Sequence, residues 1–459
     1  MSETGMGLSG KQLVLSTLRH EKTERIPWIP FAGVHAGKLT AYSARDVLTD
    51  GKKLLASLLA VNRTYGADGQ PVMFDLQIEA EILGCDLLWT DKGPPTVASH
   101  PLASEVEIPQ YLPDAGDGRL PMVLDVMRSM KTQVGETTAL YGLVTGIFTL
   151  ASHLRGTEIF MDMFDRPDYL AKLLAYSRDV VKRVSSLYIE AGMDVIAVVD
   201  PLVSQISPRH FTKLLSAGYT DVFTFIRDQG AFSSFFVCGD ATKNIDVMCQ
   251  TGPDSISIDE NIDLAGAKKI TDRYNITLGG NIPLTTHMLL GSQQDNMKFV
   301  VDLLDKVDQH NFILAPGCDM PYDVPVENVV GVVQAVRDPE GTRAMLQNYQ
   351  GASFDLDAVQ LPDYATLDKP LVEVFTLDSD TCAACSYMRD AAIRATQEVG
   401  DQQVELVEYK FTERENVARM MKMGVKNLPS IYINGELRYS SLIPSNRELV
   451  DEIQKRLQE

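Results

Sequence analysis

Three apolar stretches of the chain end in side chains that could bind a metal ion, namely Cys238, Glu260 and Cys318. If these stretches are parallel strands of one closed sheet, the three side chains meet at its carboxyl-end rim, where barrel enzymes carry their catalytic residues. Two thiolates and a carboxylate would hold zinc with one coordination position open, as a catalytic zinc ion requires. A single cysteine at such a place is more simply explained by packing. The coincidence of the three positions favours a zinc site.

Four polar residues end or follow other apolar runs and are candidate substrate ligands. They are Asp75, Glu79, Asp200 and Asn281. In a barrel their side chains would lie at the same rim as the two cysteines. The sequence leaves open the alternative that the acids cap helices or face solvent.

Eight short apolar runs alternate with segments of helical periodicity, at 25–31, 70–75, 139–146, 194–200, 232–238, 255–260, 276–281 and 312–318. Nearly continuous apolar strands that alternate with helices indicate a parallel sheet buried on both faces. Eight such units predict an α/β fold of the (β/α)₈ TIM-barrel type. No G-x-G-x-x-G motif follows the first strand to favour an open dinucleotide-binding sheet. Residues 80–130 are irregular and proline-rich, and we expect an insertion or lid there.

A different alternation begins near residue 370, with strands expected at 371–377, 404–411, 430–433 and 436–439 and helices at 382–399, 412–423 and 445–458. This order is the arrangement of thioredoxin. Cys382 and Cys385 form a Cys-x-x-Cys pair at the start of the first helix, where the helix dipole lowers a thiol pKa and supports disulfide exchange. The alternative is half of a zinc site, but no second pair of ligands lies nearby. We predict that Cys382 and Cys385 are a catalytic redox dithiol.

Residues 370–459 resemble the thioredoxin and glutaredoxin superfamily over their whole length. In that superfamily a cis-proline faces the dithiol, and Pro429 in Leu428-Pro429-Ser430 occupies the matching place. Thr381 stands where a tryptophan usually precedes the first cysteine. The resemblance therefore implies the fold and the chemistry, and it leaves the redox partner open.

The chain has 459 residues, so we expect two domains: a barrel at 1–340, a linker at 341–369 and a thioredoxin-like α/β domain at 370–459. A net charge of −20 argues against nucleic-acid and anionic-membrane partners. No stretch reaches the roughly 18 uninterrupted apolar residues of a membrane span. Six cysteines are too few for a disulfide scaffold, and the first residues do not read as a signal peptide. We therefore expect a cytoplasmic protein.

The first domain carries a set of short motifs: Arg25-Ile26-Pro27, Phe74-Asp75 with Glu79-Ala80-Glu81-Ile82-Leu83-Gly84, Gly279-Gly280-Asn281-Ile282-Pro283, and Pro316-Gly317-Cys318-Asp319-Met320-Pro321 with Pro325-Val326-Glu327-Asn328. Together they resemble the uroporphyrinogen decarboxylase superfamily over about residues 10–340, and more narrowly its branch of corrinoid-dependent methyltransferases. That resemblance implies zinc held by a His-x-Cys on strand five and a Cys on strand eight, near a carboxylate on strand six. Here the cysteines are Cys238 and Cys318 and the carboxylate is Glu260. The histidine of the pattern is replaced by Phe236, which cannot bind a metal.

The resemblance implies methyl transfer between a corrinoid on a partner protein and a small acceptor, which we expect to be a thiol activated by zinc. One alternative is a metal-free decarboxylase that uses Asp75, although the arginine motif that binds porphyrinogen carboxylates has no counterpart around residues 28–45. Another is a metal-free barrel that only binds a corrinoid or tetrapyrrole and presents the redox domain. The direction of transfer and the existence of a homo-oligomer stay open.

The fusion of the two domains suggests a link between their cysteines. We expect Cys382 and Cys385 to cycle between dithiol and disulfide while the barrel cysteines stay reduced. A disordered linker of about thirty residues would span roughly 30 Å, which would let the dithiol approach the barrel rim. On this interpretation the C-terminal domain keeps the barrel site, or a substrate bound there, reduced.

Overall fold

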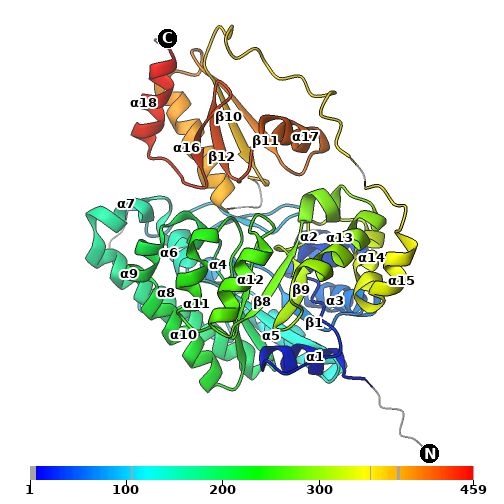
Figure 1. The fold of residues 1–459 in the computed structure, drawn as a ribbon. Helices are drawn as coiled ribbons and strands as arrows, with labels where there is room; N and C mark the ends of the chain where they lie inside the picture. Colours follow the sequence, from blue (N-terminus) through cyan, green and yellow to red (C-terminus); the bar gives the residue numbers. More distant parts are fainter. Residues whose placement is uncertain (1–6, 105–106, 352, 380–382, 458–459) are drawn as a thin grey trace, which may run out of the picture. The chain divides into compact units, whose positions relative to one another are not determined.

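A computed structural model describes residues 7–104, 107–351, 353–379 and 383–457. The chain divides into two compact units near residue 351, and each is treated by itself (Figure 1). Among the described residues, no helix is both long and apolar enough to cross a membrane.

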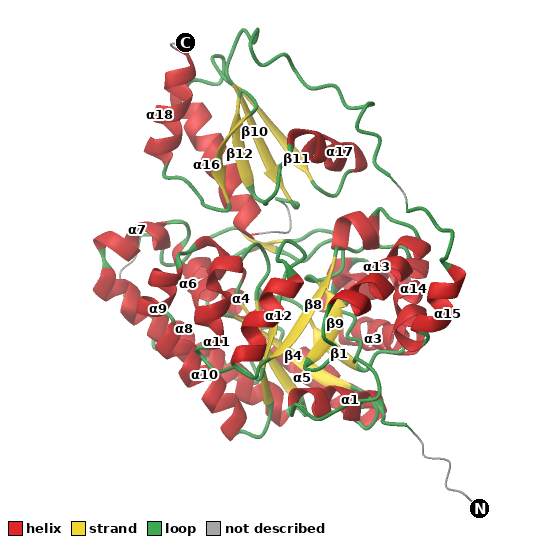
Figure 2. Ribbon diagram, in the orientation of Figure 1, coloured by secondary structure: helices red, strands yellow, loops and turns green. Residues whose placement is uncertain are grey.

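The first unit is built on a parallel sheet whose strands follow one another in chain order. They are β1 (Gly69–Met73), β4 (Ala139–Thr145), β5 (Val195–Val199), β6 (Phe232–Phe236), β7 (Ser255–Ser257), β8 (Thr277–Ile282) and β9 (Phe312–Pro316). Nearly every strand residue is buried. Helices cover the outer face of the sheet (Figure 2). Apolar side chains from the strands, such as Phe74, Tyr141 and Phe236, fill the inner face. These strands coincide with the apolar runs read from the sequence.

The sheet closes on itself through the proline-flanked segment that precedes β1. Ile29 N–H donates to the carbonyl of Leu314 on β9 at 3.0 Å, and Leu314 N–H donates to the carbonyl of Pro27 at 2.9 Å. On the other side, Asp68 N–H donates to the carbonyl of Trp28 at 3.0 Å, next to the start of β1. Prolines lack the N–H that a longer ladder needs, so this eighth position is a single bridge rather than a strand. The predicted TIM barrel is confirmed.

Helices connect the strands of the barrel. They are α1 (Gly10–Leu18), α2 (Ala44–Thr49), α3 (Gly51–Tyr65), α4 (Ile78–Ile82), α5 (Leu120–Val134), α6 (Ile147–Arg155), α7 (Glu158–Asp165), α8 (Pro167–Glu190), α9 (Pro208–Leu214), α10 (Ser216–Asp228), α11 (Ile245–Cys249), α12 (Leu264–Arg273), α13 (Gln293–Lys306), α14 (Val326–Arg337) and α15 (Pro339–Met345). Short helical turns occur at η1 (Val34–Thr40), η2 (Pro201–Gln205), η3 (Thr242–Asn244) and η4 (Leu284–Leu289).

The region 80–130 is more ordered than the sequence suggested. It holds a small hairpin of β2 (Leu87–Leu88) and β3 (Thr96–Val97), and α5 begins at Leu120. The proline at 121 does not break this helix, because in the first turn its missing N–H has no helical partner to lose.

The second unit is a four-stranded sheet in the order β11 (Glu405–Lys410), β10 (Leu371–Thr376), β12 (Ser430–Ile433) and β13 (Glu436–Ser440). Helices α16 (Ala383–Val399) and α18 (Asn446–Leu457) cover one face, and α17 (Arg414–Met423) covers the other (Figure 2). Asn434 and Gly435 both have positive φ and join β12 to β13, as expected of a two-residue hairpin. This is the predicted thioredoxin arrangement.

Much of the predicted linker packs against the second unit. Val359 is 2% exposed, and Lys422 of α17 donates to its carbonyl at 2.7 Å. The hydroxyl of Tyr364 donates to the buried carboxylate of Glu373 at 3.1 Å. A disordered tether of thirty residues is therefore wrong. Earlier in the linker, Tyr349 is held by the first unit instead, since its hydroxyl donates to Asp295 at 3.0 Å and hydrogen-bonds with Ser292 at 2.8 Å.

The closing segment is anchored by one buried ion pair. Asp68 is 3% exposed, and its two carboxylate oxygens accept hydrogen bonds from the Arg25 guanidinium at 2.6 and 2.7 Å. One of these oxygens also accepts the N–H of Trp28 at 2.9 Å. Removing one member of a buried pair leaves the other charge without compensation, which is costly.

We expect Asp68→Ala to lower the free energy of unfolding of the barrel by about 3 kcal/mol. The control Asp125→Ala removes an exposed ion pair and should change it by less than about 0.5 kcal/mol. Urea unfolding followed by tryptophan fluorescence measures both, because Trp28 and Trp89 are the two tryptophans of the chain and both lie in the barrel unit. Equal midpoints for the two variants would contradict the anchoring role.

Candidate functional site

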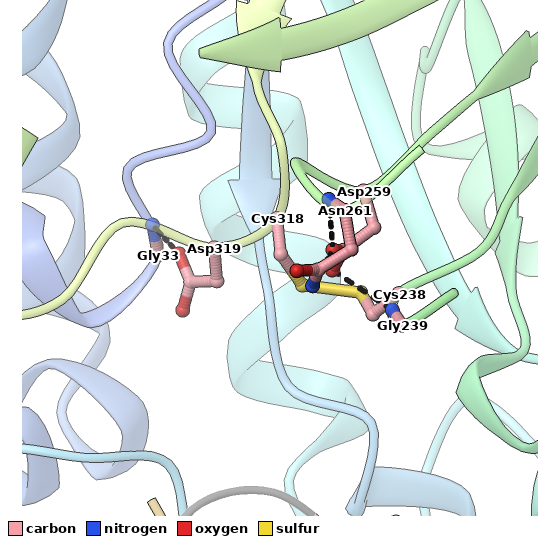
Figure 3. Close-up of a disulfide and its surroundings, with 7 residues drawn as sticks. All are labelled: Gly33, Cys238, Gly239, Asp259, Asn261, Cys318 and Asp319. Carbon is pink, nitrogen blue, oxygen red and sulfur yellow. Dashed lines mark hydrogen bonds between the residues drawn. A yellow bond between two sulfur atoms is a disulfide. The ribbon is translucent and has the colours of Figure 1, made fainter. Parts of the chain in front are cut away.

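The three predicted metal ligands come together at the carboxyl-end rim of the barrel. Cys238 follows β6, Glu260 follows β7 and Cys318 follows β9. The sulfur atoms of Cys238 and Cys318 are joined as a disulfide, with 6.0 Å between their Cα atoms (Figure 3). Since β7 and β8 lie between β6 and β9 in the sheet, the disulfide crosses the rim instead of joining neighbouring strands. The expectation that both cysteines are reduced is wrong for this structure.

A buried acid fixes the loop that carries Cys238. Asp259 accepts the N–H of Gly239 at 2.8 Å and the N–H of Asn261 at 2.9 Å (Figure 3). The side-chain amide of Asn281 then donates to the carbonyl of Asp259 at 2.8 Å and to that of Ile262 at 2.9 Å. The amide hydrogens of Asn281 are therefore committed to the fold, and its role as a substrate ligand stays a prediction.

Glu260 is held close to the loop of Cys318. A Cβ atom added to Gly317 would lie 2.6 Å from the backbone nitrogen of Glu260, so only glycine fits before Cys318 without a backbone shift. Oε1 of Glu260 is buried and has no hydrogen-bond partner among the described residues. Burial, together with the neighbouring charge of Asp259, raises the pKa of Glu260 to about 8.

Asp319, directly after Cys318, is a rim residue that the sequence reading did not single out. It accepts the N–H of Gly33 at 2.7 Å, at the start of η1. Burial raises the pKa of Asp319 to about 8. The sequence could have indicated Asp319 as a rim residue, because it directly follows Cys318 in the Pro-Gly-Cys-Asp motif.

Aromatic rings fill the barrel directly beneath the disulfide. Phe236 is fully buried, and its ring centroid lies 4.9 Å from that of Phe31 and 5.9 Å from that of Phe74. Both cysteines pack against this cluster. Phe236 lies two residues before Cys238 on the same inner face of the barrel, because side chains alternate along a strand. An apolar ring therefore stands where the family resemblance implies a histidine ligand.

Asp75 lies at the rim after β1, but its carboxylate is already paired. It is 2% exposed, accepts the N–H of Gln77 at 2.8 Å and forms an ion pair with Arg119 at 2.5 Å. Arg119 also pairs with Glu81 at 2.6 Å, while its Nη2 is buried without a hydrogen-bond partner among the described residues. The sequence reading missed Arg119, because its partner is 44 residues away and no local motif marks the pair.

Glu79 and Asp200 also make structural hydrogen bonds. Glu79 accepts the N–H of Thr145 at 3.1 Å and its hydroxyl at 2.8 Å. Asp200 accepts the N–H of Phe148 at 2.8 Å and the hydroxyl of Thr149 at 2.6 Å, in the first turn of α6, and it also accepts the hydroxyl of Tyr219. Burial raises the pKa of both carboxyl groups. Asp200 thus acts as the capping alternative describes, and a substrate contact of Glu79 or Asp200 stays a prediction.

The rim residues do not fit a zinc ion in this arrangement. The two sulfur atoms are bonded to each other, and Phe236 offers no donor atom. Over the described part of the chain, no three His, Cys, Asp or Glu side chains converge as a metal site requires. The predicted zinc site of Cys238, Glu260 and Cys318 is thus not formed here, and no catalytic step is derived through a metal.

The redox motif of the second unit lies partly outside the described residues. Cys382 is one of those not described, so its predicted position at the helix start stays a prediction. Cys385 is buried in α16, and the N–H of Leu377 donates to its sulfur at 3.4 Å. The peptide bond between Leu428 and Pro429 is cis, as the resemblance implied.

Comparison with known proteins assigns both units. Residues 9–339 match the uroporphyrinogen decarboxylase (URO-D) family. The chain belongs to the uroporphyrinogen decarboxylase family. Residues 371–454 match a thioredoxin domain, so the predicted fusion is confirmed.

Relatives within the family include methyltransferases and decarboxylases. The methylcobamide:CoM methyltransferase MtbA of Methanosarcina acetivorans is 24% identical over 337 residues, which cover 72% of this chain and 97% of the relative. A uroporphyrinogen decarboxylase of Nostoc punctiforme is 22% identical over 285 residues, with 60% and 79% covered. A solved methyltransferase structure from Methanosarcina mazei has a TM-score of 0.67 at 22% identity and covers 72% of this chain and 99% of its own. At that identity the structural likeness shows the fold alone.

A metal-binding prediction follows from Phe236. In reduced protein we expect Phe236→His to bind about one zinc ion per chain, because imidazole would add the donor that the two thiolates lack. The wild-type chain and the apolar control Phe236→Leu should hold far less than one equivalent. Metal analysis after reduction and dialysis measures all three. One zinc per wild-type chain, removed by Cys318→Ser, would contradict this reading of the rim.

Proposed function

We propose that this chain is a methyltransferase that moves a methyl group between a corrinoid, carried on a partner protein, and a small acceptor thiol. The main support for this proposal is that the chain matches 97% of the length of a methylcobamide:CoM methyltransferase. Cys238 and Cys318 lie together at the barrel rim, where such an enzyme would bind its substrates. That relative is named for the same donor and for the thiol CoM.

The reaction is a displacement at carbon. The acceptor thiol releases its proton to solvent, and its sulfur attacks the methyl carbon to form a carbon–sulfur bond. The carbon–cobalt bond breaks, and its electron pair stays on cobalt as Co(I). A reaction of this kind depends mainly on holding the sulfur, the methyl carbon and the cobalt in line. The rim of this barrel can hold reactants in such an alignment, because the aromatic cluster beneath it fills the barrel interior.

The chain's own residues supply the shape of this site. The ring cluster of Phe31, Phe74 and Phe236 closes the barrel interior and keeps water from entering from below. Asp259 and Asn281 fix the loop after β7, which places Glu260 beside the loop of Cys318. We propose that substrates meet above this floor, between the loops that carry the two cysteines.

The decarboxylase alternative is less well supported. It would need Asp75 to face a substrate, yet this carboxylate is 2% exposed and is neutralised by Arg119. No arginine stands between residues 28 and 44 to bind the carboxylates of a porphyrinogen. The methyltransferase is therefore the function that we carry forward.

Methyl transfer can be tested with methylcobalamin as the donor and 2-mercaptoethanesulfonate, which is CoM, as the acceptor. We expect the reduced chain to consume methylcobalamin, seen by its absorbance, and to form the methyl thioether, seen by mass spectrometry. Cys318→Ser should lower kcat/KM by about 10²-fold, because it changes a group at the reacting centre. Cys249→Ser, at a buried position away from the rim, should leave the rate unchanged.

The alternative reaction provides the opposing outcome. Release of CO₂ from a porphyrinogen, with no methyl transfer to a panel of small thiols, would overturn the proposal and favour the decarboxylase.

A further inference from the structure

The four cysteines of the barrel unit are of two kinds. Cys85 and Cys249 are 4% and 2% exposed, and burial raises the pKa of each thiol to about 12. Thiol–disulfide exchange needs an accessible thiolate, so neither is suited to it. Cys238 and Cys318 are both partly exposed at the rim, and their sulfur atoms are bonded to each other. The barrel therefore carries one pair of cysteines that is suited to exchange.

The rim disulfide is not what closes the barrel. The sheet is continuous from β1 to β9, and the Trp28 segment completes the ring through backbone hydrogen bonds. None of these hydrogen bonds involves a cysteine sulfur atom. The barrel can therefore open and re-form this disulfide without losing a sheet contact.

Each loop that carries a rim cysteine has an anchor of its own. Gly239 N–H, directly after Cys238, donates to Asp259 at 2.8 Å, and Asp319, directly after Cys318, accepts the N–H of Gly33 at 2.7 Å (Figure 3). The Cα atoms of the two cysteines lie 6.0 Å apart, within the range that a disulfide spans without backbone movement. Because the anchors persist when the sulfur–sulfur bond opens, the two thiols stay within reach of each other.

The position of the pair distinguishes it from a buried structural disulfide. The bond crosses the carboxyl-end rim, from the loop after β6 to the loop after β9, above the ring cluster of Phe31, Phe74 and Phe236. Exposed disulfides are the ones that small thiols reduce readily, and they serve regulation or catalysis more often than stability. A bond that is accessible, dispensable for closure and placed at the rim is suited to reversible exchange.

We propose that Cys238 and Cys318 form a reversible thiol–disulfide switch at the barrel rim, set by a low-molecular-weight thiol and its disulfide. The thiolate of the small thiol attacks one rim sulfur, which forms a mixed disulfide and releases the other rim cysteine as a thiolate. A second small thiol attacks the sulfur of the bound one, which frees the rim cysteine and leaves the small disulfide. Two electrons pass to the rim pair, and the two protons that the small thiols lose end on the rim thiols. The small disulfide reverses the reaction.

The switch bears on methyl transfer, and this consequence rests on the proposed function. The disulfide form has no thiol at the rim, whereas the dithiol form has two. The proposed acceptor is itself a small thiol, so it can first reduce the rim pair and then accept the methyl group. The exchange does not depend on that function, and it is measured without any methyl donor.

A redox titration tests the switch in the full chain. In Cys382→Ser/Cys385→Ser the rim pair is the one accessible pair of cysteines, and this variant is equilibrated with mixtures of glutathione and glutathione disulfide. After an acid quench and alkylation, peptide mapping without reduction follows Cys238 and Cys318. We expect the two to pass together from linked to alkylated as the mixture becomes reducing, and to return when it becomes oxidising. The linked fraction should follow the square of the glutathione concentration, because two thiols are consumed.

Matched variants separate the rim pair from the other cysteines. Cys249→Ser should titrate as its parent does, whereas in Cys238→Ser the remaining Cys318 should carry a glutathione adduct and no internal link. The wild-type chain serves if the double variant fails to fold, because mapping distinguishes its two pairs. Rim cysteines that stay thiols in glutathione disulfide alone, or a link that is reduced only after unfolding in urea, would overturn the proposal.

A kinetic measurement tests the consequence for methyl transfer in the same double variant. Started from the disulfide form, with methylcobalamin and 2-mercaptoethanesulfonate, the initial rate should lie at least about tenfold below that of the pre-reduced chain, because a group at the reacting centre is altered. The resulting lag should shorten as the thiol concentration rises, and Cys249→Ser should show the same lag. Equal rates for both forms would overturn control by the switch. A pre-reduced chain without activity would overturn the proposed function instead, while the titration still decides the exchange.

Discussion

Closure of the parallel sheet is the constraint on which the site depends. The backbone of residues 27–29 bonds to β9 on one side and to the start of β1 on the other. Once the ring is closed, the carboxyl ends of all the strands share one rim, and residues far apart in sequence become neighbours. Cys238 and Cys318 are 80 residues apart in the chain and still meet there. The Asp68–Arg25 pair matters to the site through this closure, although neither residue lies at the rim.

Sequence patterns were sufficient for the fold and for the location of the site. Each strand is a short apolar run, since both faces of a parallel sheet in a barrel are buried. Cys238, Glu260 and Cys318 could be placed together because each follows such a run, and strand ends share a rim whatever the loops do. The Asn434–Gly435 hairpin could be predicted because few residue pairs tolerate the positive φ that it requires.

The roles of individual rim residues could not be predicted in the same way. An acid after a strand looks alike in sequence whether it meets a substrate or caps a helix. Both carboxylate oxygens of Asp200 accept hydrogen bonds from the start of α6, whereas Oε1 of Glu260 is buried without a partner among the described residues. Arg119 was missed because its position in the chain says nothing of the carboxylates that surround it in space. Whether two cysteines bind a metal or each other depends on the distance between them in space, which a linear pattern does not contain. The sequence showed Phe236 in place of the histidine, but not that its ring packs against Phe31 and Phe74 beneath the two cysteines.

The packing of the segment before β10 bears on how the thioredoxin domain can be dissected from the chain. The family match begins at residue 371, but the ring of Tyr364 lies against Gly435, and its hydroxyl donates to the buried Glu373. A fragment cut at the family boundary would strip this cover and expose a carboxyl group that the intact chain keeps buried. A fragment that begins near residue 353 would keep this cover, so the packed domain extends beyond the residues of the family match.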